Sequence, residues 1–134
     1  MIEIFRKCKI CKEIKYLQDF GNASIKNGKQ YYRWKCKKCY NEFKNNKRKK
    51  DYEVYKKYKD TLFCNICGYS KKTHKTFTSE ALDFHHFITG KKYNIGDKAW
   101  GTPLHKLKKE IKKCRILCNR CHSEIHAYKK KNYE

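Results

Sequence analysis

Histidines and cysteines near the carboxyl end of the sequence have the spacing of metal ligands. His122 and His126 are four residues apart, so a helix would place both imidazoles on one face. Cys118 and Cys121 have the Cys-x-x-Cys spacing with which two thiolates share one metal ion. Adjacent helical residues point about 100° apart, so the thiols and the imidazoles face different directions. One helix could therefore contribute to two metal sites, one of thiolates and one of imidazoles.

Both sites need further ligands, which the sequence supplies upstream. Cys64 and Cys67 offer two more thiols, and the neighbouring His85 and His86 offer two more imidazoles. Successive side chains of a strand face opposite sides, which suits adjacent histidines with different tasks. A neutral imidazole can take a proton from water near pH 7, and a divalent cation can neutralise charge at a phosphate. These groups indicate phosphodiester hydrolysis, whereas a closed structural site of four histidines would leave no position for a substrate.

The cysteines as a whole predict two structural zinc sites. Eight of the nine form Cys-x-x-Cys pairs, at Cys8 and Cys11, Cys36 and Cys39, Cys64 and Cys67, and Cys118 and Cys121. The alternative is a secreted disulfide framework, but the first residues lack the apolar core of a signal peptide and no membrane-spanning run follows. We therefore expect two structural Zn²⁺ ions and a cytoplasmic location. Cys114 is left over and is expected to be a small buried residue rather than a ligand.

The composition predicts a polyanionic partner. The 35 Lys and Arg residues against 13 Asp and Glu give a formal charge of +22, which two four-cysteine zinc sites would lower only to about +18. Such an excess favours nucleic acid, here double-stranded DNA, although a lysine-rich genome would also raise the charge. No membrane partner is expected. The residues predicted to contact DNA are the basic run Lys47, Arg48, Lys49 and Lys50, together with Arg33.

The chain is expected to contain a four-cysteine zinc module over residues 1–44, a basic helical linker over 45–60, and a second domain over 61–134. With 39% hydrophobic and 36% charged residues, apolar burial contributes little, so metals must supplement the core. In the first module Asn27-Gly28 predicts a two-residue turn between strands, and the expected core residues are Tyr16, Leu17 and Phe20. Aromatic residues at three-residue spacing predict a helix over 40–60, with a break near Asn45-Asn46.

The second domain is expected to alternate short elements with polar loops. Residues 82–88 are strand-like, and residues 71–79 and 89–100 are predicted loops. Thr102 and Pro103 predict the N-cap and the first position of a helix, with an apolar stripe at Leu104, Leu107 and Ile111. The remaining histidines, expected at the surface, are His74 and His105.

Three motifs taken together resemble the zinc-containing HNH endonucleases, most closely their phage-type branch. They are Cys64-x-x-Cys67, Leu82-Asp-Phe-His85-His86, and Ile116-Leu117-Cys118-x-x-Cys121-His122-x-x-x-His126. The resemblance covers most of residues 62–128 and implies a ββα-metal site on a treble-clef zinc scaffold. Residues 8–44 also resemble the small zinc module that often precedes such domains, a layout similar to that of some compact HNH restriction enzymes. The implied fold class is small, zinc-stabilised α+β.

The resemblance also implies roles for individual residues. His86 would be the general base, and the catalytic divalent cation (Mg²⁺, Mn²⁺, Ni²⁺ or Zn²⁺) would be bound by His85, His122 and His126. The strand register could exchange the roles of His85 and His86. The family has an asparagine nine residues before the first helical histidine, where this chain has Lys113, and Asn119 does not replace it. Asp83 lies two residues before His85 and is a candidate partner for a ligand imidazole.

The activity expected from these roles is metal-dependent hydrolysis of DNA phosphodiester bonds, leaving 5′-phosphate and 3′-hydroxyl ends. The alternative is a non-catalytic zinc-dependent DNA-binding protein, against which the presence of both histidine pairs argues. RNA cleavage uses the same chemistry and stays open. One site per chain fits either a nicking monomer or a homodimer that cuts both strands. Homing, restriction and phage DNA processing all fit these expectations.

Overall fold

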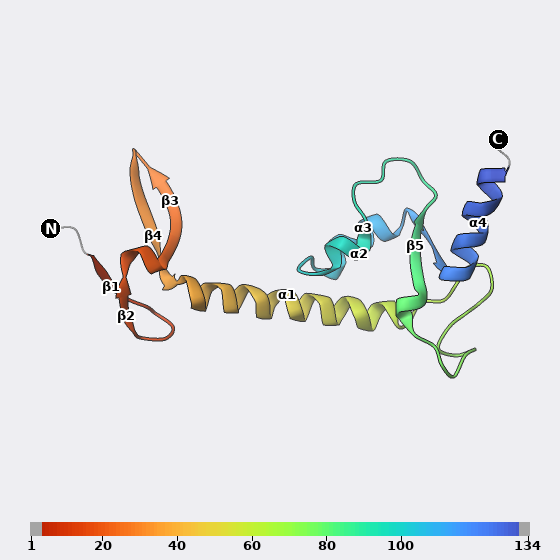
Figure 1. Cartoon of the computed structure of the whole chain (residues 1–134), viewed down its shortest axis with the longest axis horizontal. Helices are drawn as coiled ribbons and strands as arrows, with labels where there is room; N and C mark the ends of the chain where they lie inside the picture. Colours follow the sequence, from red (N-terminus) through yellow and green to blue (C-terminus); the bar gives the residue numbers. More distant parts are fainter. Residues whose placement is uncertain (1–3, 132–134) are drawn as a thin grey trace. The chain divides into compact units, whose positions relative to one another are not determined.

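The computed structural model describes residues 4–131, and Figure 1 shows its helices and strands. The chain divides into an N-terminal unit, Met1–Lys47, and a C-terminal unit, Arg48–Glu134. Helix α1 (Lys37–Lys59) contributes residues to both units. Each sheet in the described part of the chain is an antiparallel pair of strands, so the fold is small and mixed α+β.

Two β-hairpins build the N-terminal unit. β1 (Phe5–Lys7) pairs with β2 (Ile14–Tyr16) and, after the 3-10 helix η1 (Leu17–Asp19), β3 (Phe20–Lys26) pairs with β4 (Lys29–Cys36). At the tip of the second hairpin, Asn27 and Gly28 both have positive φ, 49° and 73°. Those angles belong to the two-residue turns that match the twist of a hairpin, so the predicted turn is confirmed.

The apolar core of the N-terminal unit is small. Phe20 is 1% exposed and packs against Cys8 and Cys36. The other expected core residues do not join it, because Tyr16 is 51% exposed and Leu17 is only half-buried. An isolated hairpin has no second layer to cover its aromatic face, which is why the prediction for Tyr16 is wrong. With so little apolar burial, the unit needs the metal that its cysteines can bind.

Helix α1 runs without interruption from Lys37 to Lys59. The break predicted near Asn45-Asn46 is absent, because this stretch contains no Gly or Pro and an interior asparagine costs a helix only about 0.7 kcal/mol. The helix also begins before the expected residue 40, directly after β4. Its buried side chain, Tyr55, packs against α2 and α3 of the C-terminal unit.

The C-terminal unit is built on an antiparallel pair of strands followed by a helix (Figure 1). β5 (Leu82–His86) pairs with β6 (Cys114–Cys118), and α4 (Asn119–Lys131) follows β6 directly and contacts both strands. Alternation along β5 places Asp83 and His85 on one face and His86 on the other. The strand ends at His86, two residues before its predicted end.

The connection between β5 and β6 carries two short helices, α2 (Ile95–Ala99) and α3 (Leu104–Ile111), and the 3-10 helix η2 (Ser79–Ala81) precedes β5. α2 lies where a loop was predicted, because five residues are too few for a periodic signal. α3 begins at Leu104, since the extended backbone of Pro103 (φ −56°, ψ 141°) makes that residue the N-cap in place of Thr102. The predicted apolar stripe is confirmed by the burial of Leu107 and Ile111.

Two hydrophobic clusters stabilise the C-terminal unit. One surrounds the cysteines of this unit and includes Leu82 and Leu117. The other joins Tyr55 to the inner faces of α2 and α3, and Phe84 packs against both clusters. Among residues 4–131, no helix has the length and apolar character needed to cross a membrane.

Candidate metal centres and catalytic site

Four cysteines converge in the N-terminal unit. Cys8 and Cys11 lie on the turn between β1 and β2, Cys36 ends β4, and Cys39 lies in the first turn of α1. Their Sγ atoms all lie within 4.8 Å of one another. Cys8 Sγ accepts hydrogen bonds from the backbone N–H groups of Cys36 (3.3 Å) and Ile10 (3.4 Å). Burial raises the pKa of the Cys8 thiol, but these N–H groups outweigh it and bring the pKa down to about 6.

Four more cysteines converge in the C-terminal unit. Cys64 and Cys67 lie on the turn after α1, Cys118 ends β6, and Cys121 lies in the first turn of α4. These Sγ atoms also lie within 4.8 Å of one another, and those of Cys67 and Cys118 are 3.6 Å apart. Thiolates around a tetrahedral zinc with bonds of about 2.3 Å have sulfur atoms about 3.7 Å apart. The donor set therefore fits zinc.

Thiol ionisation follows a similar pattern in both cysteine clusters. Burial raises the pKa of Cys64, but neighbouring backbone N–H groups lower it to about 6, as for Cys8. In the opposite direction, hydrogen bonding to Cys36 and burial raise the pKa of Cys39 to about 12, and burial raises that of Cys121. Neighbouring thiols resist joint ionisation unless a cation lies between them, so zinc binding releases protons. Both predicted sets of four cysteines are assembled and could hold two structural zinc ions.

Cys114 belongs to neither cluster. Its Sγ donates a hydrogen bond to the backbone carbonyl of Glu110 at 3.6 Å, and its side chain packs beside α2 and α3. Burial raises the pKa of the Cys114 thiol to about 11, and a protonated thiol is a poor ligand and nucleophile. Cys114 is a packing residue as predicted, although it is half-buried rather than fully buried.

Three of the four histidines singled out in the sequence come together. His85 comes from β5, and His122 and His126 come from α4. His122 Nε2 lies 3.1 Å from His85 Nδ1 and 3.1 Å from His126 Nε2. Nitrogen ligands at about 2.0 Å from a tetrahedral metal lie about 3.3 Å apart, so this spacing fits imidazoles that share one cation. We refer to these residues as the three-histidine cluster.

Asp83 fixes the orientation of His122. Asp83 Oδ2 accepts a hydrogen bond from His122 Nδ1 at 3.0 Å, which leaves the lone pair of Nε2 facing the other two imidazoles. With its amide nitrogen turned toward Asp83, Asn119 donates to Asp83 Oδ2 at 3.0 Å and to the Ala81 carbonyl at 3.1 Å. The predicted contact between Asp83 and a ligand imidazole is therefore present, and that imidazole belongs to α4.

The surroundings of His85 favour its neutral, metal-binding form. Burial, followed by positive charge on His122 and Lys129, lowers the pKa of His85. Neutral imidazole is the form that coordinates metals. The histidines expected at the surface, His74 and His105, are both exposed.

His86, the predicted general base, lies on the opposite face of β5 from His85 but lines a cavity together with a member of the cluster. This cavity of about 240 Å³ is lined by His86, His122 and Asp83, and also by Lys59 and Asn94. The His86 ring is largely buried, with 11% of its side chain exposed. Its Nε2 donates to Glu110 Oε1 at 3.1 Å. The predicted base and one predicted ligand therefore share one cavity.

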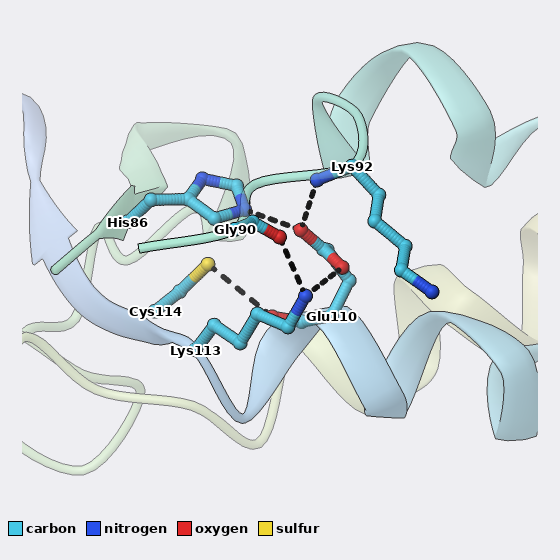
Figure 2. Close-up of polar contacts among 6 residues, drawn as sticks. All are labelled: His86, Gly90, Lys92, Glu110, Lys113 and Cys114. Atoms are coloured by element: carbon cyan, nitrogen blue, oxygen red, sulfur yellow. Dashed lines mark hydrogen bonds and ion pairs between the residues drawn. The ribbon is translucent and has the colours of Figure 1, made fainter. Parts of the chain in front are cut away.

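Glu110 is the centre of a polar network that was not predicted (Figure 2). Besides the bond from His86, Oε1 accepts the backbone N–H of Lys92 at 2.9 Å, and Oε2 accepts Lys113 Nζ at 3.0 Å. The Lys92 N–H is the largest cause that lowers the pKa of Glu110, to about 2, with Lys113 and His86 adding to it. Glu110 is therefore ionised at neutral pH although it is only 2% exposed.

Glu110 and Lys59 are the site residues that sequence reasoning missed. Glu110 had a detectable signal, because it follows Leu107 by three residues and precedes Ile111, which puts an acidic side chain on the apolar face of α3. Lys59 is one of many lysines on α1, and nothing in its spacing distinguishes it. Lys59 lines the cavity, and its Nζ lies 6.0 Å from the centroid of the Phe84 ring. Burial lowers the pKa of Lys59.

The residues predicted to contact DNA differ in exposure. The exposed ones are three lysines of α1, Lys47, Lys49 and Lys50. Arg48 is half-buried and lies so close to Gly101 that a Cβ there would sit 2.7 Å from Arg48 Cγ. Arg33 is also half-buried, with its guanidinium 4.0 Å from the centroid of the Tyr40 ring. Both arginines therefore also contribute to packing.

No protein-family model, curated protein or solved structure significantly matches the chain. Its function is consequently inferred from the geometry of the side chains themselves.

We expect Asp83→Asn to weaken metal binding at the three-histidine cluster by about 10- to 100-fold, because His122 loses a carboxylate that orients it. Calorimetric titration of the zinc-loaded protein with Mn²⁺ or Ni²⁺ would measure the affinity. Glu124→Gln is a matched control, since it removes the same charge from the exposed face of α4. Equal losses in both variants would show that overall charge, and not the hydrogen bond, sets the affinity.

Proposed function

We propose that this chain is a metal-dependent HNH-type endonuclease that hydrolyses DNA phosphodiester bonds and leaves 5′-phosphate and 3′-hydroxyl ends. His86 is the general base, and a divalent cation is held by His85, His122 and His126. The main support for the proposal is the three-histidine cluster, in which His122 Nε2 lies 3.1 Å from a ring nitrogen of each of the other two histidines. This cluster lies beside a cavity that His86 also lines. The chain order of strand, strand and helix around this cluster agrees with a ββα-metal site on a zinc scaffold.

Different side chains of the site have different roles in the proposed reaction. A bound divalent cation would neutralise charge on the phosphate and stabilise the departing 3′ oxygen. His86 accepts the proton of the attacking water at Nδ1, the ring nitrogen that does not contact Glu110. Lys59 adds a positive charge in the same cavity, where a phosphate oxygen can approach it. Asp83 holds His122 in the orientation that ligation requires.

The charge of the N-terminal unit supports DNA as the partner. A cavity of about 850 Å³ on this unit is lined by four cations and three aromatic rings and, among the described residues, by no acidic side chain. The cations are Arg6, Lys26, Lys29 and Arg33, and the rings are Tyr31, Tyr32 and Trp34. Arg6 and Lys9 also lie over the Trp34 ring, at 4.5 and 5.0 Å from its centroid. Cations that attract phosphates beside rings that contact bases or sugars are typical of nucleic-acid surfaces.

Incubation of the zinc-loaded protein with supercoiled plasmid and with fragmented genomic DNA tests the proposal. Parallel reactions contain Mg²⁺, Mn²⁺ or EDTA. Nicked or linear product that requires the added cation supports a nuclease, and the ratio of nicked to linear plasmid separates a nicking monomer from a homodimer that cuts both strands. Intact DNA with a clear gel shift in every reaction would instead favour the non-catalytic DNA-binding protein. Matched RNA substrates would test the choice of DNA.

Neutralising the exposed lysines of α1 should weaken DNA binding equally for unrelated sequences. For Lys47→Gln, Lys49→Gln and Lys50→Gln combined, the slope of log K against log salt should fall by about 0.9 for each lost phosphate contact, or roughly 3 in total. Fluorescence anisotropy over a salt series measures both the affinity for DNA and this slope. The control is the triple variant Lys71→Gln, Lys72→Gln and Lys75→Gln, which removes the same charge from an exposed loop. If the two triple variants changed the slope equally, net charge alone would explain the binding.

A further inference from the structure

Glu110 is a buried carboxylate whose polar partners are the candidate base, the loop that follows that base, and Lys113. Its two oxygens accept from His86 Nε2, the backbone N–H of Lys92 and Lys113 Nζ (Figure 2). The distances are 3.1, 2.9 and 3.0 Å. These contacts satisfy the carboxylate although only 2% of Glu110 is exposed. The network therefore couples α3 to the end of β5 and to the loop between β5 and α2.

The stability of the fold does not by itself require a charge at this position. Glu110 lies on the face of α3 that also buries Leu107 and Ile111. Burying a carboxylate and its ammonium partner carries a desolvation cost, and apolar side chains of similar volume often replace such a pair without loss of stability. What an apolar side chain could not do is accept the hydrogen bonds from His86 and from the backbone N–H of Lys92.

This hydrogen bond sets the state and the direction of the His86 ring. A carboxylate oxygen only accepts, so His86 Nε2 carries a hydrogen, and in the neutral ring the lone pair is then on Nδ1. Figure 2 shows Nδ1 turned away from Glu110. A neutral imidazole held in this tautomer presents Nδ1 as its only basic nitrogen.

The same network holds the loop after His86. Lys113 Nζ donates to the Gly90 carbonyl at 2.8 Å as well as to Glu110, and the backbone N–H of Phe87 donates to the Lys113 carbonyl at 3.1 Å. Lys113 occupies the position at which the HNH resemblance leads one to expect an asparagine that orients this loop. A lysine reaches the loop carbonyl here, and the carboxylate neutralises its charge.

We propose that Glu110 is a positioning residue that selects the tautomer and fixes the ring of His86, and that Lys113 joins it in anchoring the adjacent loop. The catalytic part of this inference rests on the proposed nuclease function, whereas the structural part, the orientation of His86 and the anchoring of the loop, does not. Glu110 touches neither substrate nor metal in this role. It acts through His86 and through the backbone of residues 87–92.

Two double variants separate positioning from stability. Glu110→Met with Lys113→Met removes the carboxylate and its ammonium partner together and leaves no unpaired charge. Glu110→Gln with Lys113→Met restores a neutral acceptor for His86 in otherwise the same background. We expect the Met/Met protein to fold with both zincs bound, but to lose about 100-fold in kcat with KM for DNA unchanged within about threefold. The Gln/Met protein should recover at least about tenfold of that loss.

Long-range ¹H–¹⁵N spectra of the histidine rings give a readout that does not depend on cleavage. At about pH 8, where imidazoles are neutral, the wild-type His86 ring should show a protonated Nε2 and a bare Nδ1, and Met/Met should lose that pattern. If the wild-type protein cut no DNA but showed this tautomer, the proposed nuclease function would be refuted, whereas the inferred effect of Glu110 on the His86 ring would stand. The inference would be overturned if the His86 ring pattern were unchanged in Met/Met. It would also be overturned if Met/Met cut DNA within about threefold of the wild-type rate, or if Gln/Met recovered none of the lost rate.

Discussion

His86→Ala should lower the rate of DNA cleavage by about 10²- to 10⁴-fold, the usual contribution of a general base. The variant removes the imidazole that lines the cavity beside His122 without touching either cysteine cluster. It should therefore fold, retain two zinc ions and bind DNA with unchanged affinity. Single-turnover cleavage of labelled DNA measures the rate. Fluorescence anisotropy measures the affinity for DNA, and a metal assay measures the zinc content.

Two further variants make the assignment of His86 specific. His105→Ala removes an exposed histidine of α3 and should cut DNA like the wild type. His85→Ala should lose cleavage together with the third metal ion, because His85 belongs to the three-histidine cluster. Cleavage by His86→Ala at the wild-type rate would show that the base is wrongly assigned. If His86→Ala lost the third metal ion and His85→Ala kept it, His86 would be the metal ligand and His85 the general base.

Removal of zinc from the cysteine clusters should unfold the chain. Zinc binding at a structural site contributes about 10–16 kcal/mol, which matches or exceeds the total stability of a small domain, about 5–15 kcal/mol. Within residues 4–47, the buried core of the N-terminal unit consists of Phe20 and two cysteines. The cysteines of the C-terminal unit form part of its core. Far-UV circular dichroism during chelation, with zinc release followed by a dye, measures the effect.

Single substitutions can assign the loss to each unit. Cys8→Ser should unfold the N-terminal unit and Cys64→Ser the C-terminal unit with its histidine cluster, each with one zinc released. Cys114→Ser is the matched control and should keep both zincs, since Cys114 lies outside the clusters. A circular-dichroism spectrum that stayed unchanged after complete zinc removal would contradict the dependence on metal.

Acid should promote the same zinc loss. Zinc binds thiolates, so its affinity falls as pH decreases and thiols gain protons. The decrease should steepen below about pH 6, where Cys8 and Cys64 also become protonated. A dye competition assay over a pH series follows this dependence, because the dye reports the same zinc release that chelation causes.

The metal-ligand sets were readable from the sequence because ligand spacing is a local property. Cys-x-x-Cys places two thiols on one turn, and a separation of four residues places two imidazoles on one helix face. Both sets of four cysteines are present, and His85 lies with His122 and His126 as the HNH resemblance implied, whereas spacing alone left His85 and His86 interchangeable. Alternation along a strand likewise predicted that Asp83 and His85 share a face.

The tertiary structure decided how the candidate base is held. His86 and Glu110 are separated by 24 residues, and they meet because the packing of α3 brings its apolar face to the end of β5. The placement of Lys59 in the same cavity wall also depends on packing. Local periodicity could identify Glu110 as an acidic residue on a buried helix face, but it could not predict that His86 would be its hydrogen-bond partner. Each pair of metal ligands follows from short-range geometry, whereas the meeting of distant pairs and the partner of a buried charge follow from which elements pack together.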